Sequence, residues 1–515
     1  MTEPTTNQKI AGATGILIAA SILGHILSLG KEIFVANYFG ITKVMDAFYA
    51  AVTVPNMINN VLLTTFGAVF IPVFIKCELK NRDEANRIAS AVMNFLFIFF
   101  VFISLVLFSF APWIIKYGFH GMSPESINLA AKLLRIISFT LVMSGMVGIM
   151  TGILNAFKHF AWPAFSQMFV TAFTILFILL FVKEWGIFVL AYGLLAGLLI
   201  QFFSLMPVAG RKGFRYYFDF NFKHPAVKEM LSLALLLFTV LVGGQLNIAV
   251  DRIMASYLAA GSIAALGYAS KLVQVPLIIF SGSVALAVFP FFSSQVAENK
   301  IEEMKDSIAT SIRMSGFIFI PLTVMTVILA RPVIQVLFQR GAFTPQATSL
   351  TSIILVCYSF QFFFYAVVAI LARVFFALQD IMTLLKLTAA GVVMNIILNF
   401  VFMKIIKPPA AGLALSTSVV LFIVFFLYIL KVNRKNIILD RKYIFAGLSR
   451  VCIAAAVTGI AVMTVFSISV NTAPIIRLIL SSASGVFVFA LMSYVIKVEE
   501  LYKIFSRIKK MSGVL

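Results

Sequence analysis

The chain has 515 residues, of which 62% are hydrophobic and 11% charged, and its mean hydropathy is +1.05. Soluble domains do not carry so large an apolar share. The apolar runs are continuous over about 20 residues or more, the length that one helical crossing needs, whereas the strands of outer-membrane barrels alternate apolar and polar residues. The composition therefore predicts a polytopic helical membrane protein and excludes the soluble, secreted and barrel classes.

The formal net charge is +21, from 40 Lys and Arg against 19 Asp and Glu. In a soluble chain this excess would suggest a nucleic-acid partner, but here the basic residues cluster between apolar runs. That placement is typical of cytoplasmic loops and of contact with anionic membrane lipids. The three cysteines, Cys77, Cys357 and Cys452, lie far apart and show neither a disulfide framework nor a metal spacing.

Apolar runs bounded by charge, Pro or Gly predict 14 membrane helices. In chain order they lie near residues 10–30, 45–75, 88–115, 128–155, 161–182, 185–208, 229–257, 263–296, 307–329, 347–376, 381–403, 409–431, 442–468 and 473–497. The first lacks a convincing cleavage site, so we predict a retained helix rather than a signal peptide. The basic loops near 76–87, 211–228 and 431–442 all follow even-numbered helices, which predicts that both termini are cytoplasmic.

The chain also matches itself weakly at an offset of 221 residues. The matching pairs keep their order along the chain: Lys31 and Arg252, Gly40 and Gly261, Pro55 and Pro276, Ala156 and Ala377. Six crossings return a chain to its starting side, so this period predicts two six-helix lobes in a parallel repeat, over 1–228 and 229–435, with a substrate cavity between them. Residues 436–515 would add helices 13 and 14 and a basic cytoplasmic tail, either as a stabilising appendage or as a groove for a lipid tail.

Ionisable residues inside apolar runs are candidates for function because burying charge in a bilayer is costly. The first helix carries His25 and reaches Lys31 and Glu32, which lie at the external interface if the helix ends there, or inside the lobe interface if it continues to Phe39. Asp46 opens the second helix, either as a cap or as part of the site.

The second lobe carries Asp251, Arg252 and Lys271 inside apolar stretches. Together with Lys31 and His25, the two basic residues predict an electropositive cavity that suits an anionic substrate such as a diphosphate. Pro55 and Pro276 lie inside long runs and are candidate hinges.

The sequence shows no enzyme signature. The four histidines are scattered without metal spacing, and no Gly-rich phosphate loop ending in Lys and Ser or Thr is present. We therefore predict a transporter without a resident cofactor.

Several motifs resemble the MurJ/MviN family of lipid II flippases in the MOP exporter superfamily, over nearly the whole chain. They are DAFYAA at 46–51 followed by VPN at 54–56, VDRIMAS at 250–256, LGYA at 266–269, LFQRGAFT at 337–344 and ARVFFALQD at 372–380. The LFxxGxFT element is the most specific of them.

The resemblance implies 14 helices, two lobes around a V-shaped cavity, and alternating access that carries undecaprenyl-diphosphate-linked peptidoglycan precursor to the outer leaflet of the bacterial cytoplasmic membrane. It also implies cell-wall synthases as natural partners and, by analogy with some relatives, Asp251 as a ligand of a coupling ion such as sodium, with a proton as the alternative. The family's essential arginines fall at His25, Lys31 and Lys271, so charge is kept at two positions while the bidentate guanidinium is lost.

Two further positions depart from the family pattern. A family arginine falls at Asn59–Asn60, and the Glu-Gly-Ala element reads TFGA at 65–68. These departures leave a flippase for another polyprenyl-diphosphate-linked glycan open, such as a capsule, teichoic or O-antigen unit. A cation-coupled MATE-like exporter would need more buried carboxylates than this sequence offers. A membrane glycosyltransferase would need carboxylates or metal ligands at a membrane face. A non-transporting scaffold stays open as a further alternative.

Overall fold

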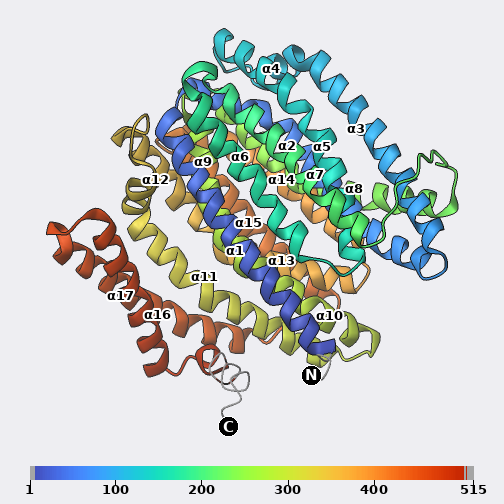
Figure 1. Cartoon of the computed structure of the whole chain (residues 1–515). Helices are drawn as coiled ribbons and strands as arrows, with labels where there is room; N and C mark the ends of the chain where they lie inside the picture. The colour runs from blue at the N-terminus through green and yellow to red at the C-terminus, as the bar shows by residue number, and fades with distance from the viewer. Residues whose placement is uncertain (1–5, 504–505, 507–515) are drawn as a thin grey trace, which may run out of the picture. The chain divides into compact units, whose positions relative to one another are not determined.

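The computed structural model describes residues 6–503 and 506, and every regular element among them is helical (Figure 1). The predicted all-α membrane fold is confirmed. The α-helices are α1 Thr6–Phe39, α2 Lys43–Glu78, α3 Arg82–Gly118, α4 Pro124–Ser138, α5 Thr140–Ala156, α6 Ala161–Trp185, α7 Phe188–Arg211, α8 Pro225–Ala255, α9 Ser262–Pro276, α10 Ser283–Ala297, α11 Ile301–Phe338, α12 Pro345–Ser359, α13 Gln361–Ala377, α14 Ile381–Ile405, α15 Pro409–Arg434, α16 Arg441–Ile468 and α17 Pro474–Val495.

Ten helical segments of the described chain are long and apolar enough to cross a membrane, and the bent pair α12 and α13 makes an eleventh. The helices α1, α2 and α8, with 34, 36 and 31 residues, also have the length for a crossing. Each of these three contains side chains outside the described set, so the number 14 stays a prediction.

The element boundaries repeat at the offset found in the sequence. The helices α4 and α12 begin and end 221 residues apart, and so do α5 and α13. The N-caps follow the same rule, because the Ser123 hydroxyl accepts from the N–H of Ser126 and the Thr344 hydroxyl accepts from the N–H of Ala347. The two halves of the chain therefore fold as copies of one pattern, as the parallel repeat predicts.

The two copies differ at their prolines. The helix α2 runs without a break through the buried Pro55, whereas Pro276 ends α9 and is followed by a π-helical turn, Leu277–Gly282, before α10. Proline lacks the N–H that the α-helical ladder needs, and a π-turn is a common way to absorb the defect. The backbone is therefore irregular at one predicted hinge and regular at the other, and both hinge roles stay predictions.

Two compact units divide the chain, and they are described separately. Unit 1 comprises residues 1–264 together with 340–343, and unit 2 comprises 265–339 together with 344–515. The predicted lobe boundaries at 228 and 435 follow the repeat rather than this division and stay predictions.

The short segment 340–343 belongs to unit 1 because it packs on the turn after α1. The N–H of Ala342 donates to the carbonyl of Asn37 at 2.8 Å. Gly40 and Gly341 both have φ of +53°, and a Cβ on either would collide with backbone of the opposing segment. The glycine of the LFQRGAFT motif is thus required by a close backbone approach.

The last two helices of unit 2 pack on α11. Figure 1 shows α16 and α17 side by side, and α16 also packs on α11. The buried guanidinium of Arg313 on α11 lies 2.5 Å from the buried carboxylate of Glu500, 3.3 Å from that of Glu499, and 4.0 Å from the ring centre of Tyr443 on α16. This ion-paired contact links both ends of the C-terminal hairpin to the body of unit 2.

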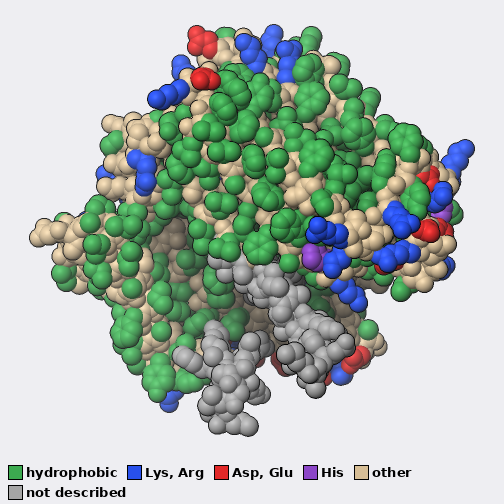
Figure 2. Space-filling model, in the orientation of Figure 1, with side chains coloured by type: hydrophobic (Ala, Val, Ile, Leu, Met, Phe, Trp, Pro, Cys, Tyr) green, Lys and Arg blue, Asp and Glu red, His purple; other side chains and the backbone are tan. Residues whose placement is uncertain are grey.

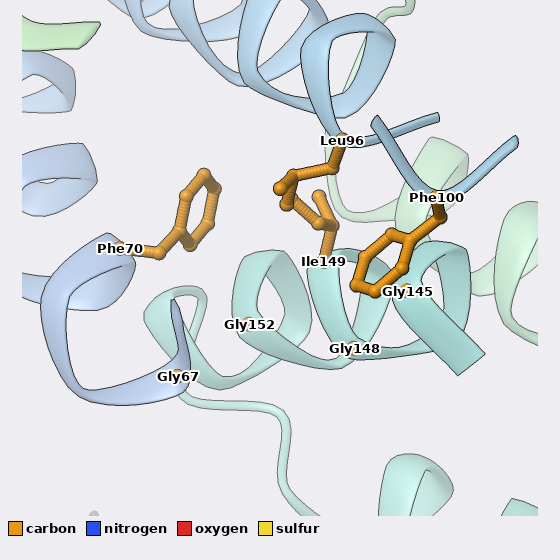
Figure 3. Close-up of a pocket in the computed structure, with 8 residues that line it drawn as sticks. All are labelled: Gly67, Phe70, Leu96, Phe100, Gly145, Gly148, Ile149 and Gly152. Carbon is orange, nitrogen blue, oxygen red and sulfur yellow. The ribbon is translucent and has the colours of Figure 1, made fainter. Parts of the chain in front are cut away.

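The core of unit 1 depends on glycines of α5. Figure 3 shows Gly145, Gly148 and Gly152 along α5, with the rings of Phe70 and Phe100 facing this glycine surface. The space enclosed there is only about 10 Å³, so this is a packing contact and not a ligand pocket.

We expect Gly145→Ala to lower the free energy of unfolding by about 1–3 kcal/mol, because its Cβ would collide with the Phe100 ring in a filled core. The matched control is Gly67→Ala, where a Cβ meets nothing within 4 Å; it should be neutral or slightly stabilising. Thermal unfolding of the detergent-solubilised chain measures both, and equal melting temperatures for the two variants would contradict the packing argument.

Candidate functional site

Unit 1 holds a group of polar side chains inside its membrane helices, which we call the polar cluster. Its members are Lys31 and Glu32 on α1, Asp46 and Tyr49 on α2, and Arg252 on α8. Glu32, Asp46 and Tyr49 are buried, while Lys31 and Arg252 are half-buried. Lys31, Glu32, Asp46 and Arg252 are the charged side chains near the buried Tyr49 side chain, so the five residues are described together.

Lys31 and Glu32 form an ion pair on α1. The Nζ of Lys31 lies 2.9 Å from Oε1 of Glu32, and the two side chains are 20% and 4% exposed. The helix continues through both residues to Phe39, so the charges do not end a span as an external pair would. The pair compensates two charges that would be costly to bury singly.

Arg252 connects α8 to α2. Its Nη1 donates to the Thr53 hydroxyl at 3.1 Å and to the Tyr49 carbonyl at 3.4 Å. Its Cζ lies 5.4 Å from the centre of the Tyr49 ring, within the range of a cation–π contact. The guanidinium is therefore held in a fixed orientation by neutral partners of α2.

Asp46 caps the start of α9. One carboxylate oxygen accepts from the N–H of Gly261 at 2.5 Å and the other from the N–H of Ala264 at 2.7 Å. These N–H groups have no partner inside the helix, and a carboxylate also complements the positive end of the helix dipole. Asp46 thus has a structural contact at the site where we predicted a substrate ligand, and that role stays a prediction.

Helical spacing explains which side chains of α2 face α8. Asp46, Tyr49 and Thr53 follow each other by three and four residues and so share one face of the helix. Asn60 lies seven residues further along the same face, and its amide donates to Oε1 of Gln245 at 3.2 Å. Sequence reasoning missed Tyr49 and Thr53 as site residues, although this spacing could have revealed them.

The polar cluster holds carboxylates as well as cations, and the electropositive cavity stays a prediction. Lys31 and Arg252 are accompanied by the buried carboxylates of Glu32, Asp46 and Asp251. An anion can therefore engage Lys31 only in exchange with Glu32 or together with it. The arrangement suits a site whose cations are held by internal partners until a strongly charged ligand arrives.

The remaining predicted residues lie around this cluster or in unit 2. His25 is half-buried on α1, two turns before Glu32, and Lys271 is half-buried on α9 within unit 2. Among the described residues no three His, Cys, Asp or Glu side chains gather in a metal-binding group, so a cation at the buried Asp251 would need backbone and hydroxyl oxygens as further ligands. The roles of all three residues stay predictions.

Comparison with protein families identifies one matching model. The model described as "Lipid II flippase MurJ" matches residues 35–483. Similar curated proteins include the probable lipid II flippase MurJ of Vibrio cholerae, 28% identical with 82% of this chain and 83% of that protein covered. The lipid II flippase MurJ of Burkholderia cenocepacia is 24% identical, with 78% of this chain and 79% of that protein covered.

Solved structures with the same fold include a lipid II flippase and a multidrug transporter. A structure titled "Lipid II flippase MurJ, inward closed conformation" superposes with a TM-score of 0.78 at 25% identity, covering 93% of this chain and 98% of that one. An inward-facing multidrug resistance MATE family transporter of the MOP superfamily has a TM-score of 0.66 at 16% identity, covering 80% and 94%. The MATE likeness concerns the fold alone.

We expect Asp46→Asn to destabilise the chain by about 1–3 kcal/mol, because Asn offers one acceptor where two N–H groups need one each, and its NH₂ would face a donor. The control Asp306→Asn neutralises an exposed carboxylate on α11 and should leave stability unchanged. Thermal unfolding in detergent compares the two variants. An Asp46→Asn protein as stable as its parent would show that the cap does not contribute to the free energy of unfolding.

Proposed function

Because the chain belongs to the MurJ family, whose model matches residues 35–483, we propose that it is a lipid II flippase of the bacterial cytoplasmic membrane. It is a multi-pass membrane transporter and not an enzyme. In this proposal it carries undecaprenyl-diphosphate-linked peptidoglycan precursor from the inner to the outer leaflet. The observation that carries the proposal is the pair of half-buried cations, Lys31 and Arg252, on membrane helices of unit 1.

The diphosphate is the part of the substrate that needs these cations. Arg252 presents a planar fork that is already oriented by Thr53 and the Tyr49 carbonyl, which lowers the entropic cost of binding an anion. Lys31 is a point charge on a flexible stem, and it exchanges Glu32 for a phosphate oxygen when substrate enters. Lys271 contributes a further cation from unit 2.

The conformational step follows from the parallel repeat. Alternating access moves one lobe against the other around a central site, with Pro276 and its π-turn as the more deformable of the two predicted hinges. The sugar headgroup stays in the cavity, and the lipid tail stays in the bilayer or along α16 and α17.

Orientation, coupling and partners complete the proposal. The basic loops near 76–87, 211–228 and 431–442 support a cytoplasmic location of both termini. A sodium ion or proton acts at Asp251 as the coupling ion. Synthases that consume the flipped lipid are the partners we propose on the outer side.

A second candidate is a flippase for another polyprenyl-diphosphate-linked glycan. It is favoured by the neutral contact of Asn60 with Gln245 where the family resemblance implies an arginine. One fewer cation weakens the grip on a diphosphate and so changes which headgroups are held well.

We expect this chain to restore growth and externally accessible lipid II in bacteria depleted of their own lipid II flippase. The measurement is the amount of lipid II in the outer leaflet, with insertion of the chain checked by immunoblot of the membrane fraction. A stably inserted chain that leaves lipid II inside would overturn the lipid II proposal in favour of the second candidate.

In the same assay we expect Lys271→Ala to abolish transport and Lys271→Arg to retain it, since the site needs a cation more than an ammonium group. Lys183→Ala removes an exposed lysine at the end of α6 and should transport normally. Normal transport by an inserted Lys271→Ala chain would remove Lys271 from the site.

A further inference from the structure

The connection between α7 and α8, residues 212–224, has an alternating pattern that the transport function does not use. Aromatic side chains stand at every second position: Phe214, Tyr216, Phe218, Phe220 and Phe222. The segment is neither helical nor a β-strand over most of its length, and it contains two tight turns, in which the N–H of Asp219 donates to the Tyr217 carbonyl and the N–H of Phe222 to the Phe220 carbonyl, both at 2.8 Å. Phe214 is buried, but Tyr216, Phe218 and Phe220 are 46%, 82% and 44% exposed. We call residues 212–224 the aromatic loop.

The aromatic loop is fixed along α3 by side chains of that helix. The amide of Asn86 donates to the Gly213 carbonyl at 3.3 Å, and the Ser90 hydroxyl accepts from the N–H of Tyr217 at 3.0 Å. Asn94 makes two contacts, donating to the Asp219 carbonyl at 2.8 Å and accepting from the Tyr216 hydroxyl at 2.7 Å. The exposed rings of the aromatic loop are therefore carried by a backbone that α3 holds in place.

The depth of the loop follows from where α3 becomes apolar. Asn94 is the last polar residue before the uninterrupted apolar run 95–103, and α3 is long and apolar enough to cross a membrane. The Phe222 ring contacts the Phe95 ring at a centroid distance of 5.6 Å. The loop thus begins beside Arg82 at the polar end of α3 and runs along this helix to Asn94. These two residues are about 18 Å apart along the helix axis, and the apolar part of α3 begins directly after Asn94.

Basic side chains lie in the aromatic loop itself and at the start of α3. Lys212, Arg215 and Lys223 of the loop are exposed, as are Arg82 and Arg87 at the start of α3. The guanidinium of Arg87 lies 4.9 Å from the Tyr217 ring centre, and Arg82 donates to the Lys212 carbonyl. Figure 2 shows these side-chain types gathered at the right of the view, where Figure 1 draws the connection between α7 and α8.

The acidic residues of the same region are engaged within the protein. Asp83 accepts from the Tyr217 hydroxyl at 3.3 Å, Glu84 lies 3.5 Å from His224, and Asp219 accepts from the N–H of Asn221 at 2.8 Å. Five basic side chains against three internally bonded carboxylates leave a surface with positive charge available to an external anion.

We propose that the aromatic loop is a binding surface for anionic phospholipid at the membrane–water interface. The rings of Phe218 and Phe220, which contact each other edge to face at 4.7 Å, lie among the upper acyl chains. The basic side chains bind the phosphates of neighbouring headgroups. Aromatic groups at this level and cations above it are the combination that the interface of an anionic leaflet attracts.

The test places a fluorophore at position 218 of the full chain in lipid nanodiscs. Phe218→Cys is introduced after the three native cysteines are replaced by Ser, and bimane is attached. Quenching is then compared between phosphatidylglycerol and phosphatidylcholine that carry bromine on the upper acyl chain. The matched position is Asn221→Cys, which is also exposed but replaces a polar side chain of the same loop.

We expect quenching at 218 to exceed that at 221 by about two-fold or more, and brominated phosphatidylglycerol to quench about two-fold better than phosphatidylcholine at 218. Arg215→Gln with Lys223→Gln should remove the lipid preference while quenching at 218 persists. Equal weak quenching at both positions would place the rings in water, which would favour a protein partner and overturn the proposal. Strong quenching without any headgroup preference would overturn the anionic-lipid assignment.

Native mass spectrometry of the unlabelled chain keeps the proposal testable if labelled variants fold poorly. The parent should retain more phosphatidylglycerol than the Arg215→Gln, Lys223→Gln variant does, after both are extracted from the same membranes. Equal retention would contradict the proposed role of the two side chains.

Discussion

The carboxylate of Asp46 holds the N–H groups of Gly261 and Ala264, and this contact fixes how α2, α8 and the first turn of α9 meet. A carboxylate that bonds two backbone donors has little freedom to move. Because Asp46 is anchored, the residues that follow it on the same face, Tyr49 and Thr53, are directed at α8. Arg252 then finds its partners on α2, and its orientation depends on a cap that is one turn of helix away.

Charge inside a bilayer must be compensated, and unit 1 meets this requirement in three ways. Lys31 forms an ion pair with a carboxylate of its own helix. Arg252 donates to oxygens of α2 and lies near an aromatic ring of that helix. Asp46 accepts hydrogen bonds from backbone N–H groups. These solutions differ in how easily a substrate can displace them. Arg252 is oriented on α2 by a hydroxyl, a carbonyl and an aromatic ring, whereas Lys31 is paired with a carboxylate of its own helix.

The sequence predicted the helical class and the 221-residue repeat because both depend on apolar run length and on Pro and Gly positions, which are local properties. It left open whether the first helix ends near residue 30 or continues to Phe39, because a run that includes Lys31 and Glu32 looks interrupted until their pairing is known. In the structure α1 continues to Phe39. It selected charged residues of α1, α2 and α8 as site candidates but not the residues that contact them. Thr53 and Gln245 are uncharged, so nothing in the sequence marks them. Their contacts, Thr53 with Arg252 and Gln245 with Asn60, arise only when α2 packs on α8.

The repeat also shows where the two halves have diverged. At the offset of 221 residues, Asp46 corresponds to Gly267, Tyr49 to Ser270 and Thr53 to Gln274. The backbone pattern is kept and the polar face is kept in part, but the anchoring carboxylate is absent from the second copy. Lys271 stands beside this altered face in unit 2. A diphosphate carries more negative charge than the balanced cluster of unit 1 can neutralise by itself. In the proposed function, Lys271 is the cation of the copy that has lost the carboxylate, which connects the divergence of the repeats with anion binding.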